Sequence, residues 1–248
     1  MSTEDHEFAP MSDRAPDAGQ RDGVSTHEWL EAEILSGRLP PGSKIVLDTL
    51  AERRSVTPFE IREAVIRLAN DGLVSLDSAS SLRVAPVSLA DLKDLTGTRI
   101  VVETEVLRSS IRAADAAWEA RVRVAFGELS AVEALLGDNP RAHLDRWERC
   151  NGEFHAALVA ACPLRRLMRF NTLLYKQHER YRRLVLVQRT TPRDVHAEHL
   201  ALFEAAIERD AAKACAVLEE HIARTVDMLA SGIRDGSWFG ASAGWPPG

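Results

Sequence analysis

Residues 55–74 read SVTPFEIREAVIRLANDGLV, and this stretch decides the fold of the first part of the chain. Thr57 precedes a proline at the first helical position and lies three residues before Glu60, which is the pattern of a capping box. Apolar side chains then recur at the spacing of one helix face, at Ile61, Ala64, Val65 and Leu68. Asn-Asp-Gly at 70–72 ends the pattern. The stretch therefore predicts an amphipathic helix from Pro58 to about residue 70.

Short elements flank this helix on both sides. The patterns predict helices at 26–36 and 47–54 before it, and strands at 73–76 and 82–87 after it, around a serine-rich turn. Three short helices followed by a hairpin are the plan of a winged helix-turn-helix. Residues 24–87 are therefore expected to form a domain that binds double-stranded DNA, with the third helix in the major groove.

From Ser88 onward the sequence predicts only helices. They are expected near 89–113, 116–136, 140–161, 164–188, 192–208 and 211–233. Residues 88–234 would thus form an all-helical bundle, and the fold class is mostly α. Residues 1–23 have few large apolar side chains and are expected to be a disordered tail, and residues 235–248 an irregular one.

Composition limits the class of protein. The 248 residues carry a formal net charge of −6, which excludes a general polycation but allows a local DNA-binding surface. No apolar run approaches the roughly 18 residues that a membrane span needs. Three scattered cysteines and the lack of a secretory signal favour a cytoplasmic protein that does not contact membranes. Residues 24–88 hold seven basic and nine acidic residues, so DNA binding requires the charges to be segregated.

Several side chains of the front domain are candidates for DNA contact. Arg62 and Arg67 lie on the third helix as donors to base edges, and Arg53 and Arg54 precede it at positions suited to phosphates. The full candidate set is Arg53, Arg54, Thr57, Phe59, Arg62, Arg67 and Arg83.

Short motifs in this domain are familiar in their order and spacing. They are Gly37-x-Leu39-x-Pro41-Gly42, Leu50-Ala51-Glu52, Val56-Thr57, Ile61-Arg62-Glu63-Ala64, Leu68 and Asp71-Gly72-Leu73-Val74. Together they resemble the winged-helix domain of GntR-type bacterial transcription regulators. The chain departs from that family at Pro58, where an arginine is usual, at Phe59-Glu60 in place of Thr-Pro, and in a wing without the Arg-Gly tip. These departures predict an operator unlike the family's commonest one.

Histidines in the rear domain are spaced as metal ligands could be. Asn151 and His155 are four residues apart, on one helix face. His199 and His221 lie 11 residues before and after Asp210, so an antiparallel helix pair would hold them at one height, roughly 16 Å from the turn. Three imidazoles and an amide oxygen converging in a bundle would form a divalent metal site with open positions. On spacing alone, the alternative is that each histidine is an independent surface or core residue and that they form no metal site.

The same region resembles the FCD effector domain of the FadR branch of the GntR family. The resemblance rests on Asn151-x-x-Phe154-His155, on Glu198-His199-x-x-Leu202-x-x-Ala205-x-Ile207-x-x-Asp210-x-x-Lys213-Ala214, and on His221. It implies a metal held by one Asp and three His, with a small carboxylate effector bound against it. Asn151 stands in the position of the Asp, and a neutral amide is the weaker ligand. The metal class implied is Zn, Ni or Mn.

Other residues near this site have open roles. The motif Arg99-x-x-x-Glu103 recurs in the FCD domain, and Arg99 could clamp the effector carboxylate or form a surface ion pair with Glu103. Residues 178–183 are expected to be a solvated helix face, with one of Tyr175, Tyr181 and Arg182 as a candidate for the pocket.

These features predict a homodimeric, metabolite-responsive transcription regulator, a repressor more often than an activator, and not an enzyme. One alternative is a metal-dependent hydrolase or hydratase. Helical geometry predicts that Glu153 and Glu198 both turn away from the ligand face, which leaves that enzyme without an obvious base. The other alternative is a DNA-binding protein with a non-functional pocket.

Overall fold

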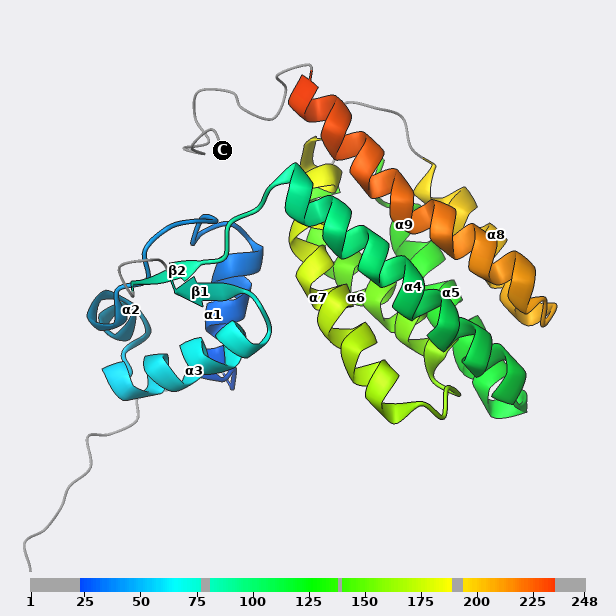
Figure 1. The fold of residues 1–248 in the computed structure, drawn as a ribbon, viewed down its shortest axis with the longest axis horizontal. Coiled ribbons are helices and arrows are strands. Elements are labelled where there is room, and N and C mark those ends of the chain that lie inside the picture. Colours follow the sequence, from blue (N-terminus) through cyan, green and yellow to red (C-terminus); the bar gives the residue numbers. More distant parts are fainter. Residues whose placement is uncertain (1–22, 77–80, 138–139, 189–193, 235–248) are drawn as a thin grey trace, which may run out of the picture.

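The computed structural model describes residues 23–76, 81–137, 140–188 and 194–234. Both tails, apart from Gly23, and most of the serine-rich turn lie outside the described residues, so the expectations for them stay expectations. Within the described part the fold is mostly helical, as the sequence predicted, and a front domain lies beside a larger helical bundle (Figure 1).

The front domain is the predicted winged helix-turn-helix. Its elements are α1 (Thr26–Leu35), α2 (Leu47–Arg54), α3 (Pro58–Asn70), β1 (Val74–Leu76) and β2 (Leu82–Val84). The two strands pair antiparallel, with Val74 opposite Val84. Capping boxes begin both α1 and α3, so the predicted start of the central helix is confirmed. One core of mainly aliphatic side chains from all three helices and both strands holds the domain together.

The connector between α1 and α2 extends the small sheet. The amide of Gly42 donates to Val84 O at 2.9 Å, and that of Ile45 donates to Leu82 O at 2.8 Å. Gly42 has φ +75°, which an L side chain rarely adopts, so the glycine of this connector is a backbone requirement.

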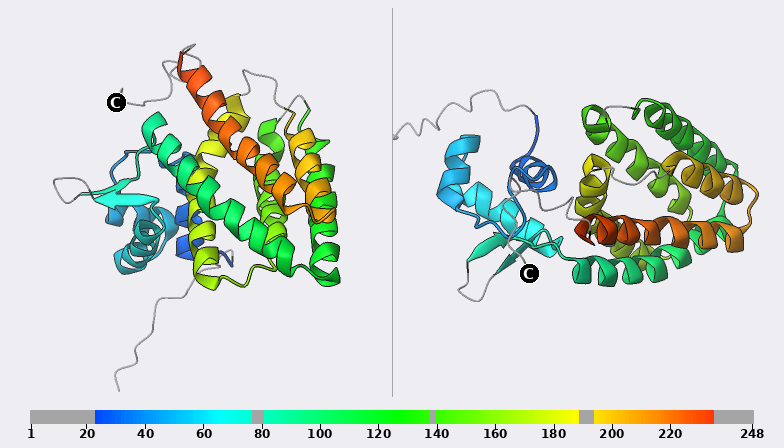
Figure 2. Two further views of the ribbon diagram at one scale, coloured as in Figure 1. Left: turned by 45° about the vertical axis from the view of Figure 1, so that its right-hand side comes forward. Right: turned by 90° about the horizontal axis from the view of Figure 1, so that it is seen from above.

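The rear domain is a bundle of long helices. They are α4 (Leu89–Ala113), α5 (Ala116–Glu133), α6 (Pro140–Val159), α7 (Arg165–Gln188), α8 (Val195–Ile207) and α9 (Ala211–Arg234). Figure 2 shows the same helices from two further sides. The main core lies among α4, α5, α6, α8 and α9. No helix in the described part of the chain combines the length and apolar character needed to cross a membrane.

Several predicted elements were too long at their ends. The second strand stops at Val84 instead of residue 87, because Pro86 has no N–H for the ladder. The helix predicted to reach residue 136 ends at Glu133, where the amides of Leu135 and Leu136 form tighter, three-residue turns.

Helix α7 contacts both domains. On the front side, Lys176 Nζ lies 2.6 Å from Glu31 and 2.8 Å from Asp71, and Gln177 Nε2 donates to Asp71 O at 3.0 Å. Arg180 Nη1 donates to Ala85 O at 3.1 Å. The bundle covers other faces of the helix, chiefly through α4.

The prediction of a solvated face at 178–183 is therefore wrong. His178, Arg180, Tyr181 and Arg182 are each less than a tenth exposed. A charged helix that packs on two sides has little solvated face, and its charges are paired with other residues instead. Arg182 pairs with Glu148, and Arg183 pairs with both Asp145 and Glu179.

Candidate metal centre and candidate DNA interface

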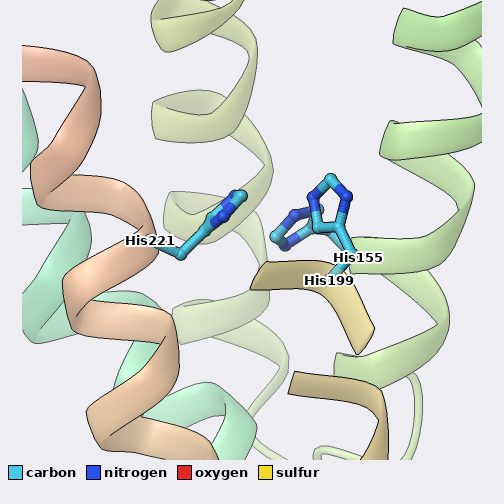
Figure 3. Close-up of side chains that lie close together, drawn as sticks. All are labelled: His155, His199 and His221. Carbon is cyan, nitrogen blue, oxygen red and sulfur yellow. The ribbon is translucent and has the colours of Figure 1, made fainter. Parts of the chain in front are cut away.

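Three histidines from three helices meet inside the bundle. His155 comes from α6, His199 from α8 and His221 from α9, and one ligand atom of each lies within 4.8 Å of the others. Their rings point toward a common centre (Figure 3). The turn at Arg209, with φ +61°, returns the chain so that α8 and α9 lie side by side, as the equal spacing of His199 and His221 around Asp210 predicted.

Each of these histidines has a glutamate against its Nδ1 atom. The Nδ1 to oxygen distances are 3.3 Å from His155 to Glu103, 2.6 Å from His199 to Glu133 and 2.8 Å from His221 to Glu198. An Nδ1–H that donates to a carboxylate leaves the Nε2 lone pair available and fixes the ring orientation. Metal-binding histidines use this arrangement, in which the carboxylate orients the ring.

Glu198 corrects a prediction. Helical geometry predicted that it turns away from the ligand face of its helix. It is nevertheless buried, because it reaches across to α9, where it contacts His221 and accepts from Arg224 at 2.8 Å. Glu153 is exposed, as expected.

Glu133 was missed by sequence reasoning. It lies at the last position of α5, where the sequence has no motif, and its partners come from other helices. Its side chain is 3 % exposed and also accepts from Trp147 and contacts His196. Burial raises its pKa, but the hydrogen bond and charge interaction with His199, together with the hydrogen bonds of His196 and Trp147, leave the pKa below its usual range.

Two buried atoms of the cluster have no hydrogen-bond partner among the described residues. They are Nε2 of His199 and Oδ1 of Asn151. Asn151 is 1 % exposed and lies one turn before His155, and its Nδ2 donates to the Tyr175 hydroxyl at 2.6 Å. That bond turns the amide so that its oxygen remains as an acceptor. Buried acceptors without donors are costly, and a cation satisfies both. The residues present therefore fit a divalent metal ion.

The charge states suit the same ligand set. Burial lowers the pKa of His155 to about 4, so this ring is neutral near pH 7, the form in which it binds a metal. Burial favours the neutral form of Glu103, but Arg99 and His155 hold its pKa at about 2. A neutral imidazole backed by an ionised carboxylate is the result.

Arg99 and Glu103 form an ion pair, and it is buried. Two guanidinium nitrogens of Arg99 lie 3.0 and 2.6 Å from Glu103 Oε2, and both side chains are 3 % exposed. The surface location considered for this pair is wrong, because α4 turns these residues toward α6 and α7. Whether Arg99 also binds an effector stays a prediction.

Of the three residues of α7 considered for the pocket, Tyr175 faces the histidine cluster. Its ring lies 5.5 Å from that of His155, and the guanidinium carbons of Arg99 and Arg182 lie 5.1 and 4.2 Å from its centroid. Burial raises the pKa of its hydroxyl, which therefore stays protonated. Tyr181 instead contacts Ser88 and Asp91 at the start of α4.

The cluster has an opening toward solvent. A groove of about 500 Å³ runs between α8 and α9, and both Glu198 and His221 line it. His221 is 9 % exposed, whereas His199 is fully buried. An ion or a small molecule could reach the histidines from this side.

The outer face of α3 is the candidate DNA interface. Arg62 and Arg67 are exposed, and neither side chain has a hydrogen bond or an ion pair with any residue in the described ranges. Thr57 caps the helix, with its Oγ1 accepting from the amide of Glu60 at 3.3 Å. Phe59, in the first turn, is 67 % exposed.

The other predicted DNA contacts are engaged within the front domain. Arg53 forms an ion pair with Glu33 and lies over Trp29. Arg54 donates to Val24 O, and Arg83 donates to Gly42 O, each at 2.9 Å. These three arginines brace α1 and the connector, and their contact with DNA stays a prediction.

Comparison with known proteins agrees with both domains. The family described as bacterial regulatory proteins, gntR family, matches residues 25–84, and the FCD domain matches residues 94–224. The HTH-type transcriptional regulator BphR of Paraburkholderia xenovorans is 38% identical over 205 residues, which are 83% of this chain and 84% of BphR. The HTH-type transcriptional repressor GlaR of Escherichia coli is 28% identical over 208 residues, which are 82% of this chain and 93% of GlaR.

A solved structure supports the fold. McbR/YncC of E. coli matches with a TM-score of 0.68 at 18% identity, over 84% of this chain and 96% of that one. The matched families and the relatives are transcription regulators and not enzymes, which confirms the prediction against a hydrolase or hydratase. The chain belongs to the GntR family of DNA-binding bacterial transcription regulators, with a C-terminal FCD domain.

Proposed function

We propose that this regulator is a cytoplasmic, homodimeric repressor of the FadR branch that responds to a small carboxylate metabolite bound at a divalent metal ion. The observation that carries the proposal is the convergence of His155, His199 and His221, each backed by a buried glutamate. The free acceptors on Asn151 and His199 support the same ligand set. Zn²⁺, Ni²⁺ and Mn²⁺ are the candidate ions.

The three histidines and Asn151 would hold the ion, which would supply open coordination positions for carboxylate oxygens. Asn151 adds no charge to the site, so the carboxylate of the effector has more of the ion's charge to neutralise. Arg99 is the proposed second anchor, although in this structure its guanidinium is occupied by Glu103.

Helix α7 offers a route from this site to the DNA-binding domain. Tyr175 faces Asn151 and His155, and the next residue, Lys176, holds Glu31 and Asp71 of the front domain. Neighbouring residues of one rigid helix thus contact the two sites. An effector that binds one position of α7 better than another would shift how the two domains are held.

Asn151→Asp tests the ligand set. A carboxylate is the better hard ligand, so Zn²⁺ or Mn²⁺ should bind more tightly, and a small carboxylate should bind the metal-loaded protein more weakly. His199→Ala and His221→Ala should lose the metal and leave the fold of the front domain intact. Metal titration calorimetry on protein freed of metal with a chelator measures all three.

His143→Ala is the matched control, because His143 lies on α6 but outside the cluster. It should bind metal as the wild type does. If Asn151→Asp changes neither affinity, Asn151 is not a ligand. If His199→Ala keeps full metal affinity, the sensing site is absent and the non-functional pocket is the better account.

A further inference from the structure

Two large apolar side chains on α3 are exposed. Phe59 is 67 % exposed and Ile66 is 56 % exposed, although the same helix buries four other apolar residues in the core. Phe59 is a departure from the family pattern named above, since threonine is usual there. An exposed phenylalanine beside an arginine that lacks a partner is a feature that the fold of this domain does not require.

Phe59 and Ile66 lie in the middle of the outward face of α3. At about 100° per residue, Phe59 and Ile66 differ by about 20° and lie opposite the buried face of Ile61 and Leu68. Arg62 lies about 60° to one side of Phe59. Phe59 thus occupies the middle of the outward face, in the first turn, where side chains of a helix in the major groove reach base edges.

The local structure fixes this position. Thr57 and Glu60 close a capping box in which Glu60 Oε2 lies 3.0 Å from both the amide and the hydroxyl of Thr57. The carboxylate of Glu60, the residue after Phe59, is thereby engaged by the cap. Proline at the first helical position sets the backbone of the same turn.

A phenyl ring makes no hydrogen bond to a base edge. In the major groove, the apolar group available to it is the C5 methyl of thymine, because the other bases present hydrogen-bond donors and acceptors there. We propose that Phe59 is a specificity-determining residue that contacts the methyl group of a thymine in each half-site, next to the base contacted by Arg62. This inference rests on the proposed placement of α3 in the major groove.

The test uses duplexes in which this methyl group is absent. Full-length protein first selects binding sites from a randomised duplex library, and each thymine of the selected site is then replaced by uracil. For the wild type, replacing the contacted thymine in one half-site should weaken binding by about fourfold, the factor that corresponds to one buried methyl group, and replacing it in both half-sites by about fifteenfold. Phe59→Ala should bind the thymine and uracil duplexes equally well.

Phe170→Ala is the matched control, because Phe170 is 60 % exposed on α7, away from α3. It should keep the wild-type preference for thymine over uracil. A Phe59→Ala variant that keeps this preference overturns the inference, and so does a selected site in which no uracil replacement weakens the wild type. Arg62→Ala distinguishes the role of Phe59 from the placement of α3 in the major groove. Unchanged affinity and sequence preference in that variant would overturn the placement of α3 itself.

Discussion

The outward face of α3 and the interior of the bundle differ in whether their arginines are paired. On α3, Arg62 and Arg67 are exposed and have no ionic partner among the described residues. In the bundle, Arg99 and Arg182 are buried, and each is paired with a buried glutamate. A solvated arginine costs little to keep unpaired, whereas a buried one requires its partner. The exposed arginines of α3 are therefore kept at little cost and stay available to an anionic ligand such as DNA.

The histidine cluster in the interior offers groups of the opposite kind. Its atoms without hydrogen-bond partners among the described residues are acceptors, on Asn151 and His199, and the carboxylates of Glu133 and Glu198 lie against Nδ1 of His199 and His221. Within the described residues, one region offers cations without an ionic partner, and the other offers acceptors without a donor. This difference supports the proposed DNA contact of α3 and the proposed metal site of the bundle.

Arg99→Ala should have the largest effect on stability. It leaves the Glu103 carboxylate buried beside a neutral histidine, and breaking a buried pair in this way costs about 3–5 kcal/mol. Urea denaturation measures the loss, and adding Glu103→Gln to the Arg99→Ala variant should recover part of it. A loss below about 1 kcal/mol would show that the pair is solvated and that the contrast with α3 is wrong.

Arg62→Ala is the counterpart at the surface. Its free energy of unfolding should stay within about 0.5 kcal/mol of the wild type, because the side chain is exposed and has no hydrogen bond or ion pair with the described residues. Operator affinity should fall by about 1–3 kcal/mol, the value of a base-reading arginine. Fluorescence anisotropy with a selected duplex measures the affinity. An unchanged affinity would remove α3 from the DNA interface.

The sequence predicted those features that depend on local spacing. The capping box at Thr57 and the hairpin after Gly72 are local patterns, and both are present. His199 and His221 lie at equal distances from one turn, so their contact could also be predicted from the sequence. The resemblance to the FCD domain predicted that His155 belongs to the same ligand set.

What the sequence did not predict depends on which helices pack together. Glu133 and Glu198 orient histidines on other helices, and no spacing along their own helices shows this. Residues 178–183 were misassigned to solvent for the same reason. A helix with charges around its circumference is typical of a solvated helix, and only its packing between two domains explains why Arg180 and Arg182 are buried.

Gly72→Ala should loosen the contact between the two regions. Gly72 has φ +72°, and a Cβ there would lie 2.4 Å from Gln177 Nε2, so that side chain must leave Asp71. Gly37→Ala is the matched control, because Gly37 has φ +77° with nothing within 4 Å. Both changes should cost about 1–2 kcal/mol of backbone strain. Hydrogen exchange of the amides at 176–181 should accelerate in Gly72→Ala alone, and equal exchange in the two variants would argue against this contact.

Thr57→Ala should have a small effect on stability and a specific effect on DNA binding. Loss of the cap costs about 1 kcal/mol, because the Glu60 amide loses its acceptor. The first turn of α3 then frays, and this turn positions Phe59 and Arg62. Ser25→Ala removes an equivalent capping box from α1, where Ser25 Oγ accepts from the Glu28 amide at 3.2 Å. Thermal unfolding should show similar losses for both variants, whereas only Thr57→Ala should weaken operator binding in anisotropy titrations. Equal weakening in both would mean that the stability of the whole front domain, and not the start of α3, controls DNA affinity.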